Sequence, residues 1–439
     1  MVQMIWNQER ETMSRGALEA LQLELLRRQV ATVYEKVPFY RHALRARGVS
    51  AQDIHSLDDL DRLPFTTKSD FRDNYPFGLL AVPRRQLSRV HASSGTTGKP
   101  TVVAYTQADV DMWREVCARN LVAGGVTEDD MVQIAMGYGL FTGGLGWHYG
   151  AEHLGATVVP MSSGNTRRQI MLLQDFEATV FCATPSYAIY LAEQADEMGV
   201  DLTQTTLRVG IHGAEPWSDE MRREIARRMG IDPIDTYGLS ELVGPGVSGE
   251  CTAHCGLHIN EDHFLAEIVD PKSGERLLPG ERGELVITAL TKEALPVIRY
   301  RTGDITRLDT SPCACGRTLA RMEKISGRTD DMLILRGVNV FPSQIETVLL
   351  RLEGVQPHYV ILVDRDMGTM DDVEIWVEVS QDLFADNIGR LRELQKTAEF
   401  EMFETLGIHA RIKLVEPHSI ERSMGKSQRV IDRRNVYGS

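Results

Sequence analysis

The sequence predicts an α/β protein with a large N-terminal domain made of several subdomains and a small α+β domain at its C-terminus. Three observations predict this class. The chain has 439 residues, about three times the ~150 residues expected for one domain. In its middle part, short runs of β-branched residues alternate with helical patterns, as in layered α/β folds. The pattern then changes after Gly327.

The N-terminal elements follow from hydrophobic spacing. An amphipathic helix is predicted over residues 17–36, where Leu and Val recur at helical intervals, and Pro38 is expected to stop it. Strand and helix patterns then alternate along the chain, which predicts a sheet covered by helices. The strands are predicted at residues 101–105, 157–160, 179–182 and 207–212, and the helices at residues 187–198 and 218–229.

The later elements divide into two groups. A small β-rich subdomain is predicted from three strand patterns with little helix between them, at residues 266–270, 283–288 and 304–308. Past Gly327 the sequence has the element mix of a compact α+β domain. Its strands are predicted at residues 360–363, 373–379 and 410–415, and its helix at residues 391–406. We place the domain boundary so that residues 1–328 form the first domain and residues 329–439 the second.

Composition and charge exclude several classes of protein. The chain is 42% hydrophobic and 25% charged, as soluble proteins are, and its net charge of −14 argues against nucleic-acid and anionic-membrane partners. Residues 131–151 carry no Asp, Glu, Lys or Arg, but six glycines in this segment argue against a membrane span. The first residues lack the pattern of a secretory signal, and six cysteines are too few for a disulfide scaffold. A cytoplasmic protein is expected.

A glycine- and hydroxyl-rich segment before a lysine has the composition of an anion-binding loop. Its glycines permit positive φ, so that successive N–H groups can point at phosphate oxygens, and its lysine adds a cation. The spacing is not that of a Walker A loop, and a strand rather than a helix is predicted after it. A turn between two strands is the alternative interpretation. The segment consists of Ser93, Ser94, Gly95, Thr96, Thr97, Gly98 and Lys99.

Two acidic motifs and a basic one follow. In Asp235-Thr-Tyr-Gly-Leu-Ser-Glu241, the final acid could hold Mg²⁺ beside phosphates, although a surface acid is the alternative. Asp304, in Tyr-Arg-Thr-Gly-Asp, could accept both hydroxyls of a ribose, or it could cap a turn. Near the C-terminus Lys426 lies beside a glycine in a basic stretch, which could also be a solvated tail.

Cysteine and histidine residues from two segments have the spacing of a metal site. Three thiols and one imidazole suit structural Zn²⁺, and Cys-x-Cys followed by glycine is typical of a tight metal knuckle. Cys255 could replace one of the ligands, and buried free thiols are the alternative. The predicted ligands are Cys251, His258, Cys313 and Cys315.

Together, in this order, these motifs resemble the acyl-adenylate-forming (AMP-binding) superfamily, and within it the phenylacetate–coenzyme A ligase branch. The resemblance extends from Tyr34-Glu-Lys-Val-Pro-Phe-Tyr40 to Lys426. It includes Gly137-Tyr-Gly-Leu-Phe-Thr-Gly-Gly-Leu-Gly146, Gly213-Ala-Glu-Pro-Trp217 and Arg336-Gly-Val-Asn-Val-Phe-Pro342. It implies a reaction of ATP with a carboxylate to give acyl-AMP and pyrophosphate, followed by transfer of the acyl group to coenzyme A.

The resemblance also implies residue roles. Lys426 would be catalytic in the first step, Glu241 would hold Mg²⁺, and Asp304 would bind the ribose. The C-terminal domain would be mobile, rotating about Asp330 as its hinge. The other nucleotide-binding residues would be the segment from Ser93 to Lys99 together with Gly213, Ala214, Glu215, Asp235, Tyr237, Gly238 and Arg328.

The acyl pocket is expected in the uncharged segment, where an aromatic wall with glycine clearance suits a flat ring. Trp147 stands where close relatives are expected to carry alanine, so the preferred aryl acid stays open. Three further alternatives stay open. The acyl group could be loaded onto a carrier protein or cofactor instead of coenzyme A, the chain could bind nucleotide without being an enzyme, and it could form a homodimer. The pocket residues are Tyr138, Phe141, Gly143, Gly144 and Trp147.

Overall fold

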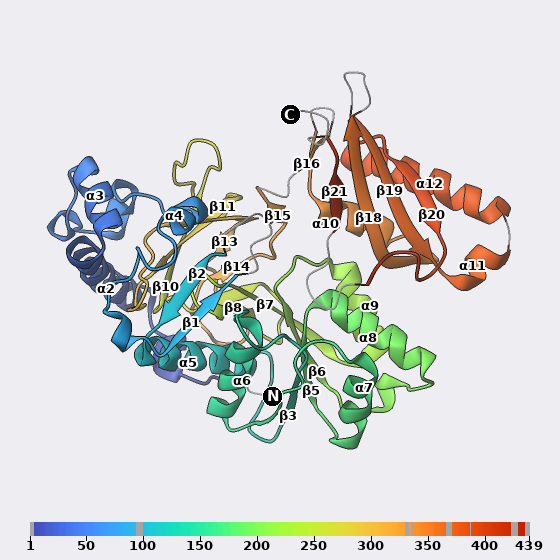
Figure 1. Ribbon diagram of the computed structural model, residues 1–439, viewed down its shortest axis with the longest axis horizontal. Helices are drawn as coiled ribbons and strands as arrows, with labels where there is room; N and C mark the ends of the chain where they lie inside the picture. The colour runs from blue at the N-terminus through green and yellow to red at the C-terminus, as the bar shows by residue number, and fades with distance from the viewer. Residues whose placement is uncertain are drawn as a thin grey trace. The chain divides into compact units, whose positions relative to one another are not determined.

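The protein is described by a computed structural model over residues 4–93, 100–329, 333–335, 338–365, 371–386, 388–422 and 429–434. Its chain forms two compact units, which contain the elements traced in Figure 1. The first unit consists of Met1–Ala183, Thr205–Ala214 and Asp232–Lys324. The second consists of Thr184–Gln204, Glu215–Ile231 and Ile325–Ser439. The second unit therefore contains two segments from the middle of the chain as well as its C-terminal part, and the division between residues 328 and 329 stays a prediction.

A nine-stranded mixed sheet forms the centre of the first unit, in the order β13-β14-β9-β8-β7-β6-β5-β3-β4. The neighbours from β7 to β4 pair parallel, while β8, β9, β14 and β13 continue the sheet antiparallel. These strands are β3 (Met131–Ile134), β4 (Thr157–Val159), β5 (Val180–Ala183), β6 (Val209–Gly213), β7 (Asp232–Leu239), β8 (Gly244–Glu250), β9 (Leu257–Ile259), β13 (Leu308–Asp309) and β14 (Arg321–Met322).

Two helices pack closely together on this sheet because glycines face the contact. A Cβ atom on Gly146 would lie 2.9 Å from the Trp113 ring of the neighbouring helix, and one on Gly150 would lie 2.5 Å from the Cβ of Cys117 in that helix. The uncharged segment at residues 131–151 is therefore a strand, a loop and a helix pressed against a neighbouring helix. The helices of this part are α5 (Gln107–Ala123), α6 (Gly143–Leu154) and α7 (Thr166–Asp175).

The first unit also contains a smaller antiparallel sheet, a hairpin and the N-terminal helices. The smaller sheet pairs β10 (Phe264–Val269) with β11 (Gly283–Ala289), and β11 with β12 (Tyr300–Thr306). The hairpin joins β1 (Arg89–Ala92) to β2 (Val102–Tyr105). The helices are α1 (Gln8–Glu11), α2 (Arg15–Lys36), α3 (Pro38–Arg47) and α4 (Lys68–Asp73), with 3-10 turns at Ala51–Asp53, Leu57–Arg62 and Arg84–Gln86.

The second unit has its own sheet and core. Its sheet has the order β20-β19-β18-β21, and α10 and α12 pack with these strands around a core that includes Ile361, Ile375 and Met402. The strands are β15 (Gly327–Arg328), β16 (Leu333–Leu335), β17 (Val338–Val340), β18 (Val355–Arg365), β19 (Asp371–Val379), β20 (Arg411–Val415) and β21 (Val430–Asp432). The helices are α8 (Pro185–Glu197), α9 (Asp219–Met229), α10 (Pro342–Leu349), α11 (Gln381–Asp386) and α12 (Ile388–Leu406), with a 3-10 turn at Leu202–Gln204.

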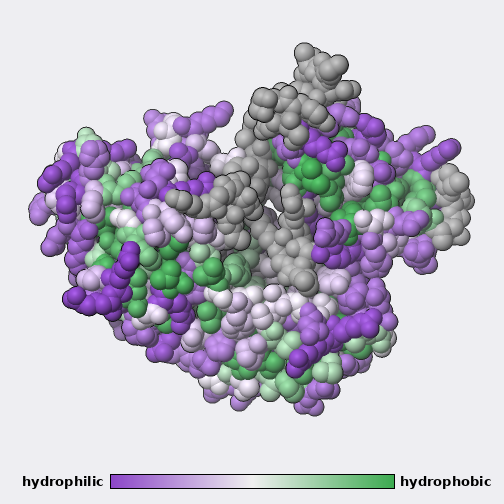
Figure 2. All heavy atoms as spheres, viewed as in Figure 1, coloured by the Kyte–Doolittle hydropathy of each residue, from purple (hydrophilic) through white to green (hydrophobic). Residues whose placement is uncertain are grey.

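The fold class predicted from the sequence is confirmed, with one local correction. The first long helix ends at Lys36 before Pro38, as predicted, and Pro38 also occupies the first turn of α3, where its missing N–H costs nothing. The strand predicted over residues 304–308 is divided between β12 and β13. Among the described residues, no helix is long and apolar enough to cross a bilayer. Figure 2 shows hydrophilic residues around the edges of the visible face, with smaller hydrophobic patches between them.

Candidate active site

Ser93, the first residue of the predicted phosphate-binding segment, directly follows β1 of the β1–β2 hairpin. Residues 94–99 lie outside the described residues, so Ser93 is the one member whose surroundings can be stated. Its backbone N–H donates to the carbonyl of Thr101 at 2.9 Å, which continues the pairing of Ala92 with Val102. The hairpin therefore holds Ser93 beside Thr101.

The carboxyl end of β6 carries the next predicted group. A Cβ atom at Gly213 would lie 2.4 Å from the carbonyl oxygen of Thr236 on β7, so only glycine permits this approach. Ala214 adopts a positive φ of 71° directly after the strand. The carboxylate of Glu215 accepts the backbone N–H of Ser186 at 2.7 Å, within the second unit.

Two of the predicted nucleotide-binding residues are joined directly. The Tyr237 hydroxyl, from β7, donates to Oδ2 of Asp304 on β12 at 2.6 Å. Asp304 is 5% exposed and lies within the strand rather than after a turn. Asp235, two residues before the tyrosine, is also buried. Gly238 has no room for a side chain, because a Cβ atom there would lie 1.8 Å from the carbonyl oxygen of Gly244.

Glu241, the predicted Mg²⁺ ligand, lies in the turn between β7 and β8 and is buried. Its carbonyl oxygen accepts a hydrogen bond from the ammonium of Lys292 at 3.0 Å. Burial lowers the pKa of Lys292 to about 8. Sequence reasoning missed this lysine; the available signal was a cation just before the apolar run at residues 294–298.

The predicted acyl-pocket residues occupy the loop after β3 and the start of α6. The Tyr138 hydroxyl lies 3.2 Å from Nδ1 of His148, and the two rings meet edge to face. Phe141 is 42% exposed, whereas Trp147 is 1% exposed. A Cβ atom on Gly143 would lie 2.4 Å from the Phe141 ring. Gly144 is equally crowded, since its Cβ atom would lie 2.7 Å from the carbonyl oxygen of Gly137.

The structure brings the four predicted metal ligands together. The ligand atoms of Cys251, His258, Cys313 and Cys315 all lie within 4.8 Å of one another, and all four residues are buried. Hydrogen bonds from Cys251 and His258 hold the pKa of the Cys315 thiol well below its usual value. The Sγ atom of Cys255 lies 3.3 Å from that of Cys313, but Cys255 is exposed.

The second unit contains the remaining predicted residues. Lys426 and Asp330 lie outside the described residues, and Arg328 is half-buried on β15. A charged cluster in this unit was not predicted. It joins Arg422 to both oxygens of Glu378 at 2.7 Å, and it joins His358 to Glu193 at 2.6 Å.

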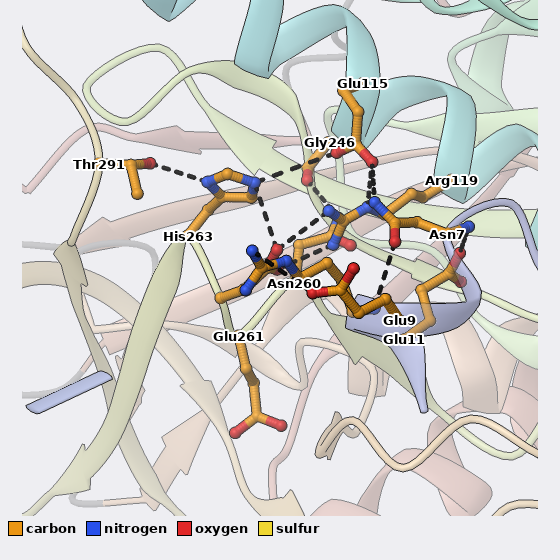
Figure 3. A network of polar contacts seen from close by, with 12 residues as sticks. Asn7, Glu9, Glu11, Glu115, Arg119, Gly246, Asn260, Glu261, His263 and Thr291 are labelled. Carbon is orange, nitrogen blue, oxygen red and sulfur yellow. Dashed lines mark hydrogen bonds and ion pairs between the residues drawn. The ribbon is translucent and has the colours of Figure 1, made fainter. Parts of the chain in front are cut away.

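A further polar cluster lies in the first unit, between α5 and the strand β10 (Figure 3). Arg119 donates to both oxygens of Asp262 at 2.8 and 3.0 Å and to Glu115 at 2.7 Å. Nδ1 of His263 lies 2.8 Å from the hydroxyl of Thr291, and burial lowers the pKa of this histidine. Through His263, the cluster therefore holds Thr291, the residue that directly precedes Lys292.

Comparison with known proteins adds family and fold relationships. Residues 36–290 match the family described as AMP-binding enzyme, and residues 337–434 match the family described as AMP-binding enzyme C-terminal domain. The phenylacetate–coenzyme A ligase of Aromatoleum evansii is 53% identical over 430 residues, which cover 97% of this chain and 96% of that protein. The phenylacetate–coenzyme A ligase of Thermus thermophilus is 50% identical, with 98% and 100% covered. A solved structure of 2-hydroxyisobutyryl-CoA ligase in the postadenylation state, in complex with R3-HIB-AMP, is 30% identical with a TM-score of 0.93, covering 99% of this chain and 93% of that one.

Proposed function

Because the chain belongs to the AMP-binding enzyme family, in its branch of phenylacetate–coenzyme A ligases, we propose that it is an AMP-forming aryl-acid–coenzyme A ligase with phenylacetate as its substrate. ATP and the carboxylate give acyl-AMP and pyrophosphate, and the thiol of coenzyme A then displaces AMP to form the thioester. The observation that carries this proposal is the hydrogen bond between Tyr237 and Asp304 at 2.6 Å, in a chain about 50% identical to such ligases over nearly its whole length.

The residues suit the electrostatics of the first step. ATP and a carboxylate are both anions, so their approach requires aligned N–H donors and cations. The segment from Ser93 to Lys99 would bind the β- and γ-phosphates, Asp304 the ribose hydroxyls, and Tyr237 one side of the adenine. Gly213, Ala214 and Glu215 would border the nucleotide, as would Asp235, Gly238 and Arg328.

Glu241 would hold Mg²⁺, which prefers carboxylate oxygens combined with those of substrate phosphates. When bound, the ion offsets the negative charge between the α- and β-phosphates. Lys426 would contact both reactants. Its ammonium would lie between the attacking carboxylate and the α-phosphate, where negative charge concentrates in the transition state. Rotation about Asp330 would then withdraw it and admit the thiol.

The acyl group would lie against Tyr138 and Phe141, with Trp147 limiting the depth of the pocket. Gly143 and Gly144 would contribute indirectly, because they let the Phe141 ring and the Gly137 carbonyl approach the main chain closely. We also propose that Cys251, His258, Cys313 and Cys315 hold a structural Zn²⁺. Three thiolates and an imidazole are a complete tetrahedral set for this ion, and the ligand atoms are already gathered within 4.8 Å.

The function is tested by ATP-dependent pyrophosphate release over aryl, indolyl and short aliphatic acids, with the products analysed with and without free coenzyme A. Phenylacetate should give the fastest release and phenylacetyl-CoA the final product. Formation of acyl-AMP that is never converted to a thioester by free coenzyme A would instead favour loading of a carrier.

The role of Lys426 is tested separately with Lys426→Ala. This variant should lose pyrophosphate release by about 100-fold or more, because a charge contact made in the transition state disappears. It should still convert supplied phenylacetyl-AMP to the thioester. Lys396→Ala, which removes an exposed lysine of α12, is the matched control and should leave both steps unchanged.

A further inference from the structure

Lys292 is a fully buried cation beside the predicted Mg²⁺ ligand. The residue is 1% exposed, and its ammonium donates to the carbonyl oxygen of Glu241 at 3.0 Å. The same ammonium lies 5.0 Å from the centre of the Tyr105 ring, whose face attracts cations. Burying an ammonium is costly, and apolar residues of similar volume often replace buried charges without loss of stability. The carboxylates of Asp109 and Glu241 attract this ammonium and offset part of that cost. Its hydrogen bond, however, is made to the main chain of Glu241.

The main chain around Lys292 is held from three directions. The side-chain amide of Gln29, on α2, donates to the Lys292 carbonyl at 2.8 Å. The carboxylate of Asp109, on α5, accepts the backbone N–H groups of Glu293 at 2.6 Å and Ala294 at 2.9 Å. On the other side, Thr291 is held by His263 of the polar cluster in Figure 3. Because its main chain is fixed, the Lys292 side chain starts from a fixed position and reaches the carbonyl oxygen of Glu241.

The turn that Lys292 contacts and the start of β8 are both held through carbonyl groups. The Tyr105 hydroxyl donates to the carbonyl of Val243 at 3.2 Å, and the Trp113 indole donates to that of Pro245 at 2.9 Å. The rings of Tyr105 and Trp113 are stacked, with centroids 5.1 Å apart. Lys292 likewise donates to the carbonyl of Glu241. It therefore holds the residue of the turn whose side chain is the predicted Mg²⁺ ligand.

We propose that Lys292 is a positioning residue for the adenylation step: by holding the main chain of Glu241, it fixes where the carboxylate of that residue meets Mg²⁺ and the phosphates. This inference rests on the proposed function, which gives Glu241 its role. An active-site group must be held to a fraction of an ångström, and a buried ammonium–carbonyl bond in a braced turn provides such rigidity.

The experiment is a mutant cycle read by the Mg²⁺ dependence of pyrophosphate release with saturating ATP and phenylacetate. Lys292→Met keeps the volume of the side chain and removes its charge and donor. It should raise the Mg²⁺ concentration for half-maximal release about tenfold and lower the maximal rate by about 10- to 100-fold. Lys292→Arg, which keeps a cationic donor, should recover most of both losses. Lys272→Met, at an exposed lysine of the same unit, is the control and should match the unchanged protein.

Glu241→Gln and the double variant Lys292→Met/Glu241→Gln complete the cycle. If Lys292 acts through Glu241, adding Lys292→Met to Glu241→Gln should change the rate by less than about twofold. The proposal would be overturned if the rate losses of the two single variants multiplied in the double variant. It would also be overturned if Lys292→Met left the Mg²⁺ requirement unaltered while Glu241→Gln raised it. If Glu241→Gln itself leaves the Mg²⁺ requirement unchanged, the Mg²⁺ assignment in the proposed function is wrong and the positioning role falls with it. Thermal unfolding checks that each variant folds; Lys292→Gln replaces Lys292→Met in the cycle if the methionine variant does not.

Discussion

The hydroxyl of Tyr237 donates a hydrogen bond of 2.6 Å to the carboxylate of Asp304, linking the large mixed sheet to the smaller antiparallel sheet of the first unit. The two residues are 67 positions apart in the sequence. Asp304 is buried, and its carboxylate is held in one orientation by this bond. A carboxylate fixed in this way can accept two neighbouring hydroxyl groups without first losing rotational freedom.

We expect Tyr237→Phe to weaken ATP binding without unfolding the protein. Loss of one hydrogen bond to a charged group, worth about 1.5–3 kcal/mol, should raise KM for ATP by roughly 10- to 160-fold, while KM for phenylacetate should stay within about twofold. Steady-state kinetics of pyrophosphate release measure both constants. Tyr34→Phe is the control, because its hydroxyl contacts Arg45 at the surface. An equal rise in both KM values would contradict a specific role on the nucleotide.

The sequence predicted several strands near this site, but it predicted neither β7, which carries Tyr237, nor the contact itself. β-branched runs and glycine-rich turns predicted strands near β5, β6 and β11, since local patterning determines these elements. Nothing local indicates that residue 237 reaches residue 304, because that approach depends on how two sheets pack. The same reason explains why Lys292 was missed: its partner is 51 positions away.

Metal removal should destabilise the first unit. The four predicted ligands join the end of β8, the strand β9 and the loop before β14, so an ion here would cross-link segments that hydrogen bonds hold only in part. We expect about one zinc per chain, and we expect a chelator or Cys315→Ser to lower the midpoint of thermal unfolding. Metal analysis after dialysis is the measurement.

Cys182→Ser provides the matched control for the metal site. This buried thiol lies on β5, apart from the cluster, so its replacement should leave the zinc content unchanged. A zinc content far below one per chain in the unchanged protein would rule out the metal assignment. Here the sequence alone was sufficient to select four residues that the fold gathers, because thiols and imidazole at close spacing are chemically distinctive.

His254 should make stability depend on pH in the alkaline range. Its ring nitrogens lie 2.9 Å from Asp232 and 3.5 Å from Glu250, and hydrogen bonds to these two carboxylates raise the pKa of His254 from 6.5 to about 9. A raised pKa means that the stabilisation is complete below pH ~6.5 and disappears as the pH rises through ~9. Because the residue is exposed, screening by solvent reduces the contribution to about 1 kcal/mol.

The measurement is the midpoint of thermal unfolding at pH 6.5 and at pH 9.5 for the unchanged protein and for His254→Asn. The unchanged protein should lose more stability between the two values than the variant, which has no charge to lose. His409→Asn serves as the control, because the ring of this histidine stacks on Phe403 in the second unit, whereas that of His254 lies near two carboxylates. Parallel pH curves for the unchanged protein and His254→Asn would show that the ion pairs contribute nothing to stability.

Trp147 should affect both stability and the choice of acid. Its side chain is 1% exposed on α6, so Trp147→Ala would leave a cavity and lower the free energy of unfolding by about 3–5 kcal/mol. If the indole limits the depth of the acyl pocket, the same change should shift kcat/KM toward larger aryl acids. Trp147→Phe separates the two effects, because it retains most of the buried area and should shift the preference less. The preference is measured as the ratio of kcat/KM for phenylacetate to that for an indolyl acid. A ratio that stays constant across all three proteins, while Trp147→Ala is destabilised, would make this tryptophan a core residue without influence on the substrate.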